Sequence, residues 1–384
     1  MNTSKNTKLF EYNRSSVQSA YNAACSENGK RFIMNDVKSS EEYTYENQKI
    51  DSHTITNIFY RTMQFERPVR AISIIKRTKV GCDGLMIEIS RNMATHPDDN
   101  FMLLSENIFI ITGMSNKEWE FEFKKKVPSS FHKNIYHHGK LNNVINKIKN
   151  IENALIIIDE IDTGDKEFQR LHKILLKCGL LNIDKLNKNN IRLIFISATI
   201  KNQLKELNKW GDVHVQFTMT VPKNYISHGD FLEKNIIKEF YPIKNVESAN
   251  MWILEDIINN YNDDYRINII RTDKNNIRYI EQACTDNKIQ FINHYSDNKI
   301  SIENMYNLFE SKLDNHVVIA IKGFYRRANL IPNNWKLKIG ALHERFCKKI
   351  DTSVQVQGLP GRMTGYWKNI IFDDHYILYI IFYI

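Results

Sequence analysis

Short, unbroken apolar runs recur along the chain. A run of this kind, bounded by polar segments, is typical of a strand buried on both faces of a parallel sheet. The runs are Ala71–Ile75, Asn107–Ile111, Ala154–Ile158, Ile191–Ile196, Ile267–Ile270, Gln290–Ile292 and Val317–Ile321. Between them, apolar residues recur at helical spacing, as in Leu171, Ile174 and Leu175. This alternation of strands and helices predicts an α/β fold built on parallel sheets.

The strand and helix pattern stops once and then restarts, which predicts two domains. A chain of 384 residues is also longer than the chains that typically fold around one hydrophobic core. The start of the chain is polar and rich in Asn and Ser, and we expect a poorly ordered or peripheral arm there. The predicted segments are the polar arm (1–42), a first domain (43–218), a linker with two prolines (219–245) and a second domain (246–384).

Two adjacent carboxylates end one of the buried runs. Ala154–Ile158 leads directly into Asp159 and Glu160. Ligands of open α/β sheets lie outside the carboxyl ends of the strands, so these acids stand where a ligand is expected. A nucleoside triphosphatase needs such a pair, one acid for Mg²⁺ and one to orient the attacking water. An ordinary strand end, whose acids cap the next helix, is the alternative interpretation.

A glycine-bearing loop follows the first run and leads into a predicted helix. This is the layout of a phosphate-binding P-loop, G-x-x-x-x-G-K-[ST]. Only Gly81 matches, because Lys76 replaces the first glycine, Cys82 the lysine and Asp83 the Mg²⁺-binding hydroxyl residue. Asp83 brings a carboxylate close to the expected phosphates, whereas Lys76 or Lys79 is a candidate substitute for the missing lysine. A plain turn before a helix is the alternative.

The composition favours one kind of partner and one kind of cellular compartment. The formal charge of +9 and a pI of about 9.0 favour a polyanionic partner. The five cysteines are isolated and form no CxxC, so neither a disulfide framework nor a zinc site is indicated. We expect an intracellular, reducing compartment. The N-terminus lacks the apolar core of a signal peptide, and the apolar run 376–384 is shorter than the ~20 residues that span a bilayer. No membrane partner is expected.

The order of the motifs resembles that of the superfamily 2 helicases. A degraded P-loop is followed by Asp159-Glu-Ile-Asp162, by Ser197-Ala-Thr199 and by the closing segment Gln355–Trp367. The segment Ile319–Ala328 adds to the likeness, which is nearest to the DEAD-like helicases of large nucleocytoplasmic DNA viruses. The resemblance implies two RecA-like P-loop NTPase domains in tandem, with ATP and Mg²⁺ bound between them and nucleic acid, DNA or RNA, lying across both. It also implies a monomer, in the host cytoplasm or the virion if the protein is viral.

The resemblance also implies roles for single residues. Asp159 would hold Mg²⁺, Glu160 would position water, and Arg362 would reach the γ-phosphate as an arginine finger. The implied nucleotide-binding residues are Thr78, Gly81, Cys82, Asp83, Gly84 and Gln357. Ser197 and Thr199 would couple the binding of ATP to the binding of nucleic acid. The alternative is that these residues cap the helix that follows. The implied nucleic-acid contacts are Thr112, Gly113, His138, Gly139, Gly323, Arg326 and Arg327, the last two of which are otherwise a surface pair.

The closing segment departs from the family pattern, in which two arginines stand three residues apart. Gly365 occupies the second arginine position, and Gln357 lies one residue early. The chain ends soon after Arg362, so we expect a second domain truncated at its C-terminus.

Three functions remain open from the sequence. The first is an ATP-dependent helicase or translocase. The second is an ATPase-deficient nucleic-acid-binding relative, because Cys82 and Asp83 replace the P-loop lysine and hydroxyl. The third is another Mg²⁺-dependent P-loop ATPase, such as a genome-packaging motor.

Overall fold

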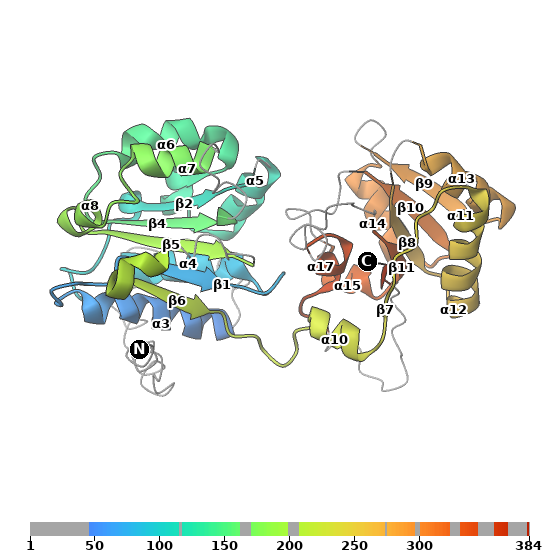
Figure 1. Ribbon diagram of the computed structural model, residues 1–384, viewed down its shortest axis with the longest axis horizontal. Helices are drawn as coiled ribbons and strands as arrows, with labels where there is room; N and C mark the ends of the chain where they lie inside the picture. Colours follow the sequence, from blue (N-terminus) through green and yellow to red (C-terminus); the bar gives the residue numbers. More distant parts are fainter. Residues whose placement is uncertain are drawn as a thin grey trace. The chain divides into compact units, whose positions relative to one another are not determined.

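The computed structural model describes most of the chain in separate stretches. These are residues 46–114, 117–161, 170–198, 207–272, 275–295, 300–322, 331–344, 357–367 and 382–383. The described residues form two compact units, one from residues up to Arg77 together with Gly81–Pro222, the other from Thr78–Val80 and the chain from Lys223 onward. Each unit is built around its own parallel sheet (Figure 1).

The first unit contains a six-stranded parallel sheet in the order β3-β2-β4-β5-β1-β6. Its strands are β1 (Ala71–Ile75), β2 (Ile108–Thr112), β3 (Ile135–Tyr136), β4 (Ala154–Asp159), β5 (Ile191–Ser197) and β6 (His214–Thr218). Its α-helices are α3 (Glu46–Thr62), α4 (Cys82–Ala94), α5 (Lys117–Lys126), α6 (Leu141–Ile148), α7 (Arg170–Lys177) and α8 (Ile183–Lys188). Short 3₁₀ turns are η3 (Ser105–Asn107), η4 (Ser129–Asn134), η5 (His138–Lys140) and η7 (Asn208–Val213).

The strand order brings the candidate site together. Strand β5 lies between β1 and β4, with Ile75 opposite Ser197 and Asp159 opposite Ile196. The carboxyl ends of the three strands therefore meet at one edge. Both faces of β4 are buried, and α6 and α7 cover one face with apolar side chains that include Val144 and Ile174. This packing explains why the strand sequences are apolar without alternation.

The second unit contains a six-stranded parallel sheet in the order β7-β12-β11-β8-β10-β9. Its strands are β7 (Ile237–Lys238), β8 (Ile267–Arg271), β9 (Gln290–His294), β10 (Val317–Ile321), β11 (Ile339–His343) and β12 (Phe382–Tyr383). Its helices are α10 (His228–Glu233), α11 (Val246–Trp252), the π-helix η8 (Ile253–Ile258), α12 (Asn259–Tyr261), α13 (Ile277–Asp286), α14 (Ile302–Glu310), α15 (Asn333–Lys336) and α17 (Leu359–Met363). Two core clusters share the strands of this sheet, with Val317 and Ile319 in one cluster and Val318 and Ala320 in the other.

One helical stretch of the second unit contains a π-helical segment. Helix α11, η8 and α12 follow one another without a break from residue 246 to residue 261. Trp252, Ile253, Ile257 and Tyr261 are all buried along it. The wider π-helical turn thus lies inside a stretch that packs on the core at both ends.

The α/β class with two parallel sheets in tandem is confirmed by the described residues. The predicted runs form β1, β2, β4, β5, β8, β9 and β10, with ends shifted by a few residues. The segment 219–245, which the sequence predicts to be a linker, contains α10 and β7. The polar arm (1–42) lies outside the described residues. None of the helices in the described stretches combines the length and the hydropathy that a membrane span requires.

Candidate nucleotide site

A buried lysine contacts both acids at the carboxyl edge of the first sheet. Lys76 follows β1, and its Nζ lies 2.7 Å from Asp159 Oδ1 and 2.9 Å from Glu160 Oε1. The three side chains are 9%, 4% and 9% exposed, respectively. Glu160 has a φ of 52°, a left-handed conformation that non-glycine residues rarely adopt. The turn after β4 thus holds both carboxylates against one ammonium.

The charges of this cluster do not balance. Burial raises the pKa of Asp159 to about 6, and the charge of Glu160 adds to that rise against the attraction of Lys76. For Lys76, burial opposes the ammonium, but the two carboxylates outweigh it and raise the lysine pKa well above its ordinary value. Lys76 is therefore protonated at neutral pH. One ammonium between two carboxylates leaves an excess negative charge that a further cation can neutralise.

The P-loop-like turn enters α4 through Gly81. This glycine has a φ of 89°, and a Cβ there would lie 1.8 Å from Nε2 of the buried Gln48 of α3. Only glycine allows this close approach of α3 to the start of α4. Gly84, in the first turn of α4, is buried.

Neither of the two substituted P-loop residues offers a cation to a phosphate. Cys82 Sγ lies 3.9 Å from Asp159 Oδ1, and burial raises the pKa of the thiol well above its ordinary value. The thiol is therefore protonated and a poor nucleophile. Asp83 forms a 2.7 Å ion pair with Lys126 at the end of α5, and the lysine offsets the negative charge of the aspartate. The tract Lys124–Lys126 is thus engaged in ion pairs, since Lys124 also binds Glu120 and Lys125 binds Glu122.

Three of the predicted coupling and nucleic-acid positions lie beside the acids. Ser197 is fully buried, and its carbonyl accepts the Lys76 N–H at 3.2 Å. Thr112 is the register partner of Asp159, and the Gly113 N–H donates to the Asp159 carbonyl at 3.0 Å. Thr199 lies outside the described residues, as do Gly323, Arg326 and Arg327.

The side chain of His137 stabilises the turn that contains the predicted pair His138 and Gly139. The His137 Nδ1 accepts the Gly139 N–H at 3.0 Å, and its Nε2 lies 3.8 Å from Glu120 Oε2. Glu120 also binds Lys140 at 2.8 Å. Burial, with the charge of Arg170, lowers the pKa of His138. This cluster follows β3.

The predicted finger Arg362 is buried within the second unit. Only 2% of the residue is exposed, and its Nη2 donates to the Gln357 carbonyl at 3.0 Å. Lys336 of α15 is equally buried and donates to Asn333 Oδ1 (2.8 Å) and to the Thr364 carbonyl (2.7 Å). Burial, followed by the charge of Arg362, lowers the pKa of Lys336 to about 7.

Gly365 lies against this lysine, at the position where the family pattern has its second arginine. A Cβ at Gly365 would lie 3.0 Å from Lys336 Nζ. Thr78 also belongs to the second unit, where its carbonyl accepts from Thr364 Oγ1 at 2.8 Å and from the Tyr225 hydroxyl.

The cluster around Lys76 fits a magnesium nucleotide in part. Mg²⁺ commonly takes one or two protein carboxylates and completes its shell with phosphate and water. Asp159 and Glu160 provide those carboxylates, although both contact Lys76. The start of α4 can bind phosphate, because the first N–H groups of a helix lack intrahelical acceptors. In the described part of the chain, no group of three or more His, Cys, Asp or Glu forms a metal site of its own.

Comparisons with known proteins give only distant likenesses. No protein-family model matches the chain, and no curated protein matches it. A complex of S. cerevisiae Dbp5 with Gle1 and IP6 is 13% identical, with 90% of this chain and 87% of that chain covered and a TM-score of 0.44. A DEAD box protein from Methanococcus jannaschii is 14% identical, with 88% and 87% covered and a TM-score of 0.44. The Escherichia coli DEAH/RHA helicase HrpB is 8% identical, with 77% and 36% covered and a TM-score of 0.44.

One of these three structures is thus a DEAD box protein and another is a DEAH/RHA helicase.

Sequence reasoning did not identify several members of the site. Gln48, Glu120, Lys126 and His137 each contact a residue of another element that is distant in sequence, besides any contacts with near neighbours. Lys126, for example, is 43 residues from Asp83. Lys76, in contrast, was found from the local sequence, since a lysine directly after a buried strand stands at the ligand edge of the sheet.

Proposed function

We propose that the protein is an ATP-dependent nucleic-acid helicase or translocase of superfamily 2 type. The observation that carries the proposal is the buried Lys76 ammonium, in contact with Asp159 and Glu160 at the carboxyl edge of the first sheet. In this proposal Lys76 supplies the cation that the P-loop lysine would otherwise supply. Phosphoryl transfer needs such a positive charge near the γ-oxygens, together with an oriented water.

The roles of the other residues follow from the same chemistry. Asp159 would hold Mg²⁺ and Glu160 would orient the attacking water. Arg362 would stabilise the transferred phosphoryl group only after its side chain leaves the Gln357 carbonyl, since it is buried in the second unit. The net charge of +9 supports a nucleic-acid partner, either DNA or RNA.

The cellular compartment, the oligomeric state and the source of the protein are part of the same proposal. The described cysteines Cys82, Cys178 and Cys284 are free and buried, as in proteins of a reducing, intracellular compartment. A monomer and a source among the large nucleocytoplasmic DNA viruses rest on the motif resemblance alone.

A specific observation also favours a second function, an ATPase-deficient nucleic-acid-binding protein. Lys76 already neutralises one of the two acids, and neither Cys82 nor Asp83 offers a cation to a nucleotide. If Lys76 stays between the acids, its ammonium repels Mg²⁺, and the charge of only one carboxylate is left to bind the ion. The third option, a packaging-type ATPase, has no observation of its own in its favour.

ATP turnover in the presence of single-stranded DNA or RNA distinguishes the two. We expect nucleic-acid-stimulated turnover in the native protein and a fall of about 10²-fold or more in Glu160→Gln, because water orientation is lost. The ATP turnover of Lys76→Met should fall by a similar factor. Glu122→Gln is a matched control, since its carboxylate is 56% exposed and binds only Lys125 among the ion pairs described.

A different outcome would select the second function. If the native protein has no turnover but the double variant Cys82→Lys, Asp83→Thr gains it, the site is disabled at the loop. Absence of both nucleotide binding and nucleic-acid binding in the native protein would exclude both functions.

A further inference from the structure

Strand β9 is an open edge of the second sheet. It ends the strand order, and among the described residues no strand pairs with its outer side. Its sequence, Gln290–His294, contains no charged residue and no proline, the usual protections of an exposed edge. The other five-residue edge, β6, has three buried residues, whereas β9 has only His294 buried. Such an edge is suited to pairing with another strand.

The ladder with β10 shows which main-chain groups of β9 are available. The Gln290 N–H donates to the His316 carbonyl at 3.3 Å, toward β10. Main-chain groups of successive strand residues point to opposite sides, so those of Phe291 and Asn293 point outward. Two donors and two acceptors therefore face the open side.

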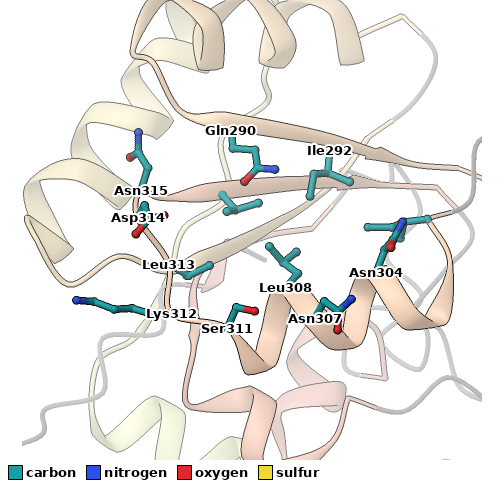
Figure 2. A pocket seen from close by; sticks show the side chains of 12 residues that line it. Gln290, Ile292, Asn304, Asn307, Leu308, Ser311, Lys312, Leu313, Asp314 and Asn315 are labelled. Carbon is teal, nitrogen blue, oxygen red and sulfur yellow. The ribbon is translucent and has the colours of Figure 1, made fainter.

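A groove of about 600 Å³ lies beside this edge, between β9 and α14. Figure 2 shows Gln290 and Ile292 pointing from the strand toward the helix that carries Asn307 and Leu308. The apolar lining residues are Ile292, Ile300, Leu308, Leu313 and Val317, and the polar lining residues include Gln290, Asn304, Asn307, Asn315 and Ser311. An apolar floor with a polar rim fits an amphipathic ligand.

The charge of the groove identifies the kind of ligand. Lys312 and Asp314 are its charged lining residues and offset each other, in contrast to the chain's net charge of +9. A neutral groove does not attract the phosphates of a nucleic acid. Side-chain amides offer one donor group and one acceptor group each, as a peptide group does.

We propose that β9 and α14 bind an extended, uncharged peptide segment of a partner protein. The segment adds to the sheet through the main chain of Phe291 and Asn293, and an aliphatic side chain enters the groove over Leu308. Addition of a strand to a sheet edge, with pockets for alternate side chains, is a general mode of peptide recognition. This inference does not depend on the nucleotide chemistry of the first unit.

The test is selection from a phage-displayed library of uncharged random heptapeptides on the full chain. Selected peptides are then synthesised with a fluorescein label, and their dissociation constants are measured by polarisation. We expect aliphatic residues at alternate positions. Asn293→Pro should weaken binding about tenfold or more, because it removes an outward N–H and leaves the β10 ladder intact. Asn293→Ala keeps that N–H and should bind as the native chain does.

Substitutions in α14 test the groove in the same way. Leu308→Lys should weaken binding about tenfold or more by placing a charge over the apolar floor. Glu303→Lys introduces the same side chain on α14 outside the groove lining and should leave binding unchanged. No enrichment of peptides, or enriched peptides insensitive to both Asn293→Pro and Leu308→Lys, would overturn the proposal. A native dimer that Asn293→Pro dissociates would also overturn it, since a second copy would then occupy the edge.

Discussion

Lys76 sets the charge balance of the first unit's carboxyl edge. A buried ion pair is weak evidence for stability, because desolvation offsets much of the attraction, but removal of one partner leaves an uncompensated buried charge. Here one ammonium serves two carboxylates, so the lysine is the member whose loss matters most. A divalent cation is the natural replacement for it.

Lys76→Met should therefore destabilise the protein by about 3–5 kcal/mol and make it respond to Mg²⁺. Thermal unfolding of both proteins with and without Mg²⁺ checks this, and the variant should gain more than the native protein. Lys125→Met is the control, because that lysine is 54% exposed in its ion pair and should cost less than about 1 kcal/mol. A variant of Lys76 as stable as the native chain without Mg²⁺ would contradict the description of the acids as charged.

Lys336 predicts a pH dependence in the second unit. Its pKa in the folded protein is lowered from 10.5 to about 7, first by burial and then by Arg362. Between these two values the unfolded chain binds a proton that the folded chain has lost, so stability rises with pH, by up to about 1.4 kcal/mol per unit.

We expect Lys336→Met to gain stability relative to the native protein at about pH 7, with the gain shrinking toward about pH 9. The free energy of unfolding in denaturant, measured at both pH values, tests this. The same substitution at Lys234, whose side chain is exposed, is the control and should change the free energy of unfolding by less than about 0.5 kcal/mol. A constant difference for Lys336→Met would show that its ammonium is not penalised by burial.

At the scale of elements, the contact between α3 and α4 depends on one glycine. Gly81→Ala adds a Cβ that would lie 1.8 Å from Gln48 Nε2, at a φ of 89°. The free energy of unfolding should fall by more than about 2 kcal/mol. Gly81→Ala in a Gln48→Ala chain, compared with Gln48→Ala alone, is the matched control, since the clashing side chain is then absent and only the backbone strain of about 1–2 kcal/mol remains. Equal losses in the two backgrounds would mean that Gln48 moves freely.

The elements show which features a sequence reveals. Buried strands such as β4 were predictable because parallel strands covered on both faces are apolar throughout. Edge strands were predictable only in part: β6 and β7 carry no unbroken apolar run, since an edge strand is only partly covered, whereas the edge strand β9 was predicted from Gln290–Ile292. The 219–245 segment contains α10 and β7, which its Pro222 and Pro242 do not reveal, because prolines signal turns whether or not a short strand lies between them.

The candidate site divides in the same way. The acids Asp159 and Glu160 follow from a local pattern, a buried strand that ends in carboxylates. Lys76 also has a local signal, since it directly follows a buried strand, but its pairing with these acids depends on strand order, as the pairing of Lys126 with Asp83 depends on helix placement. The burial of Arg362 is likewise a tertiary property, since an isolated Gly-Arg pair does not reveal its surroundings.

At the scale of the whole molecule, the net charge of +9 is the feature that bears on partners. Binding of single-stranded DNA or RNA should weaken linearly on a log–log plot as salt rises, because bound cations are released from the phosphates. Titrations by fluorescence polarisation at several salt concentrations give the slope, which counts the phosphates contacted. Leu308→Lys, outside the predicted nucleic-acid residues, should leave that slope nearly unchanged. Affinity that does not depend on salt would argue against a polyanionic partner.

The π-helical segment between Trp252 and Asn259 bears on how this chain aligns with its relatives. A deletion inside an ordinary α-helix rotates everything beyond it by ~100°, and so turns buried residues toward water. A π-helical turn holds one residue more than an α-helical turn, so it can lose that residue without such a rotation. A relative one residue shorter between Ile253 and Ile258 would keep both Trp252 and Tyr261 in the core. An alignment gap inside this helix is therefore compatible with an unchanged fold, whereas the same gap in α13 is not.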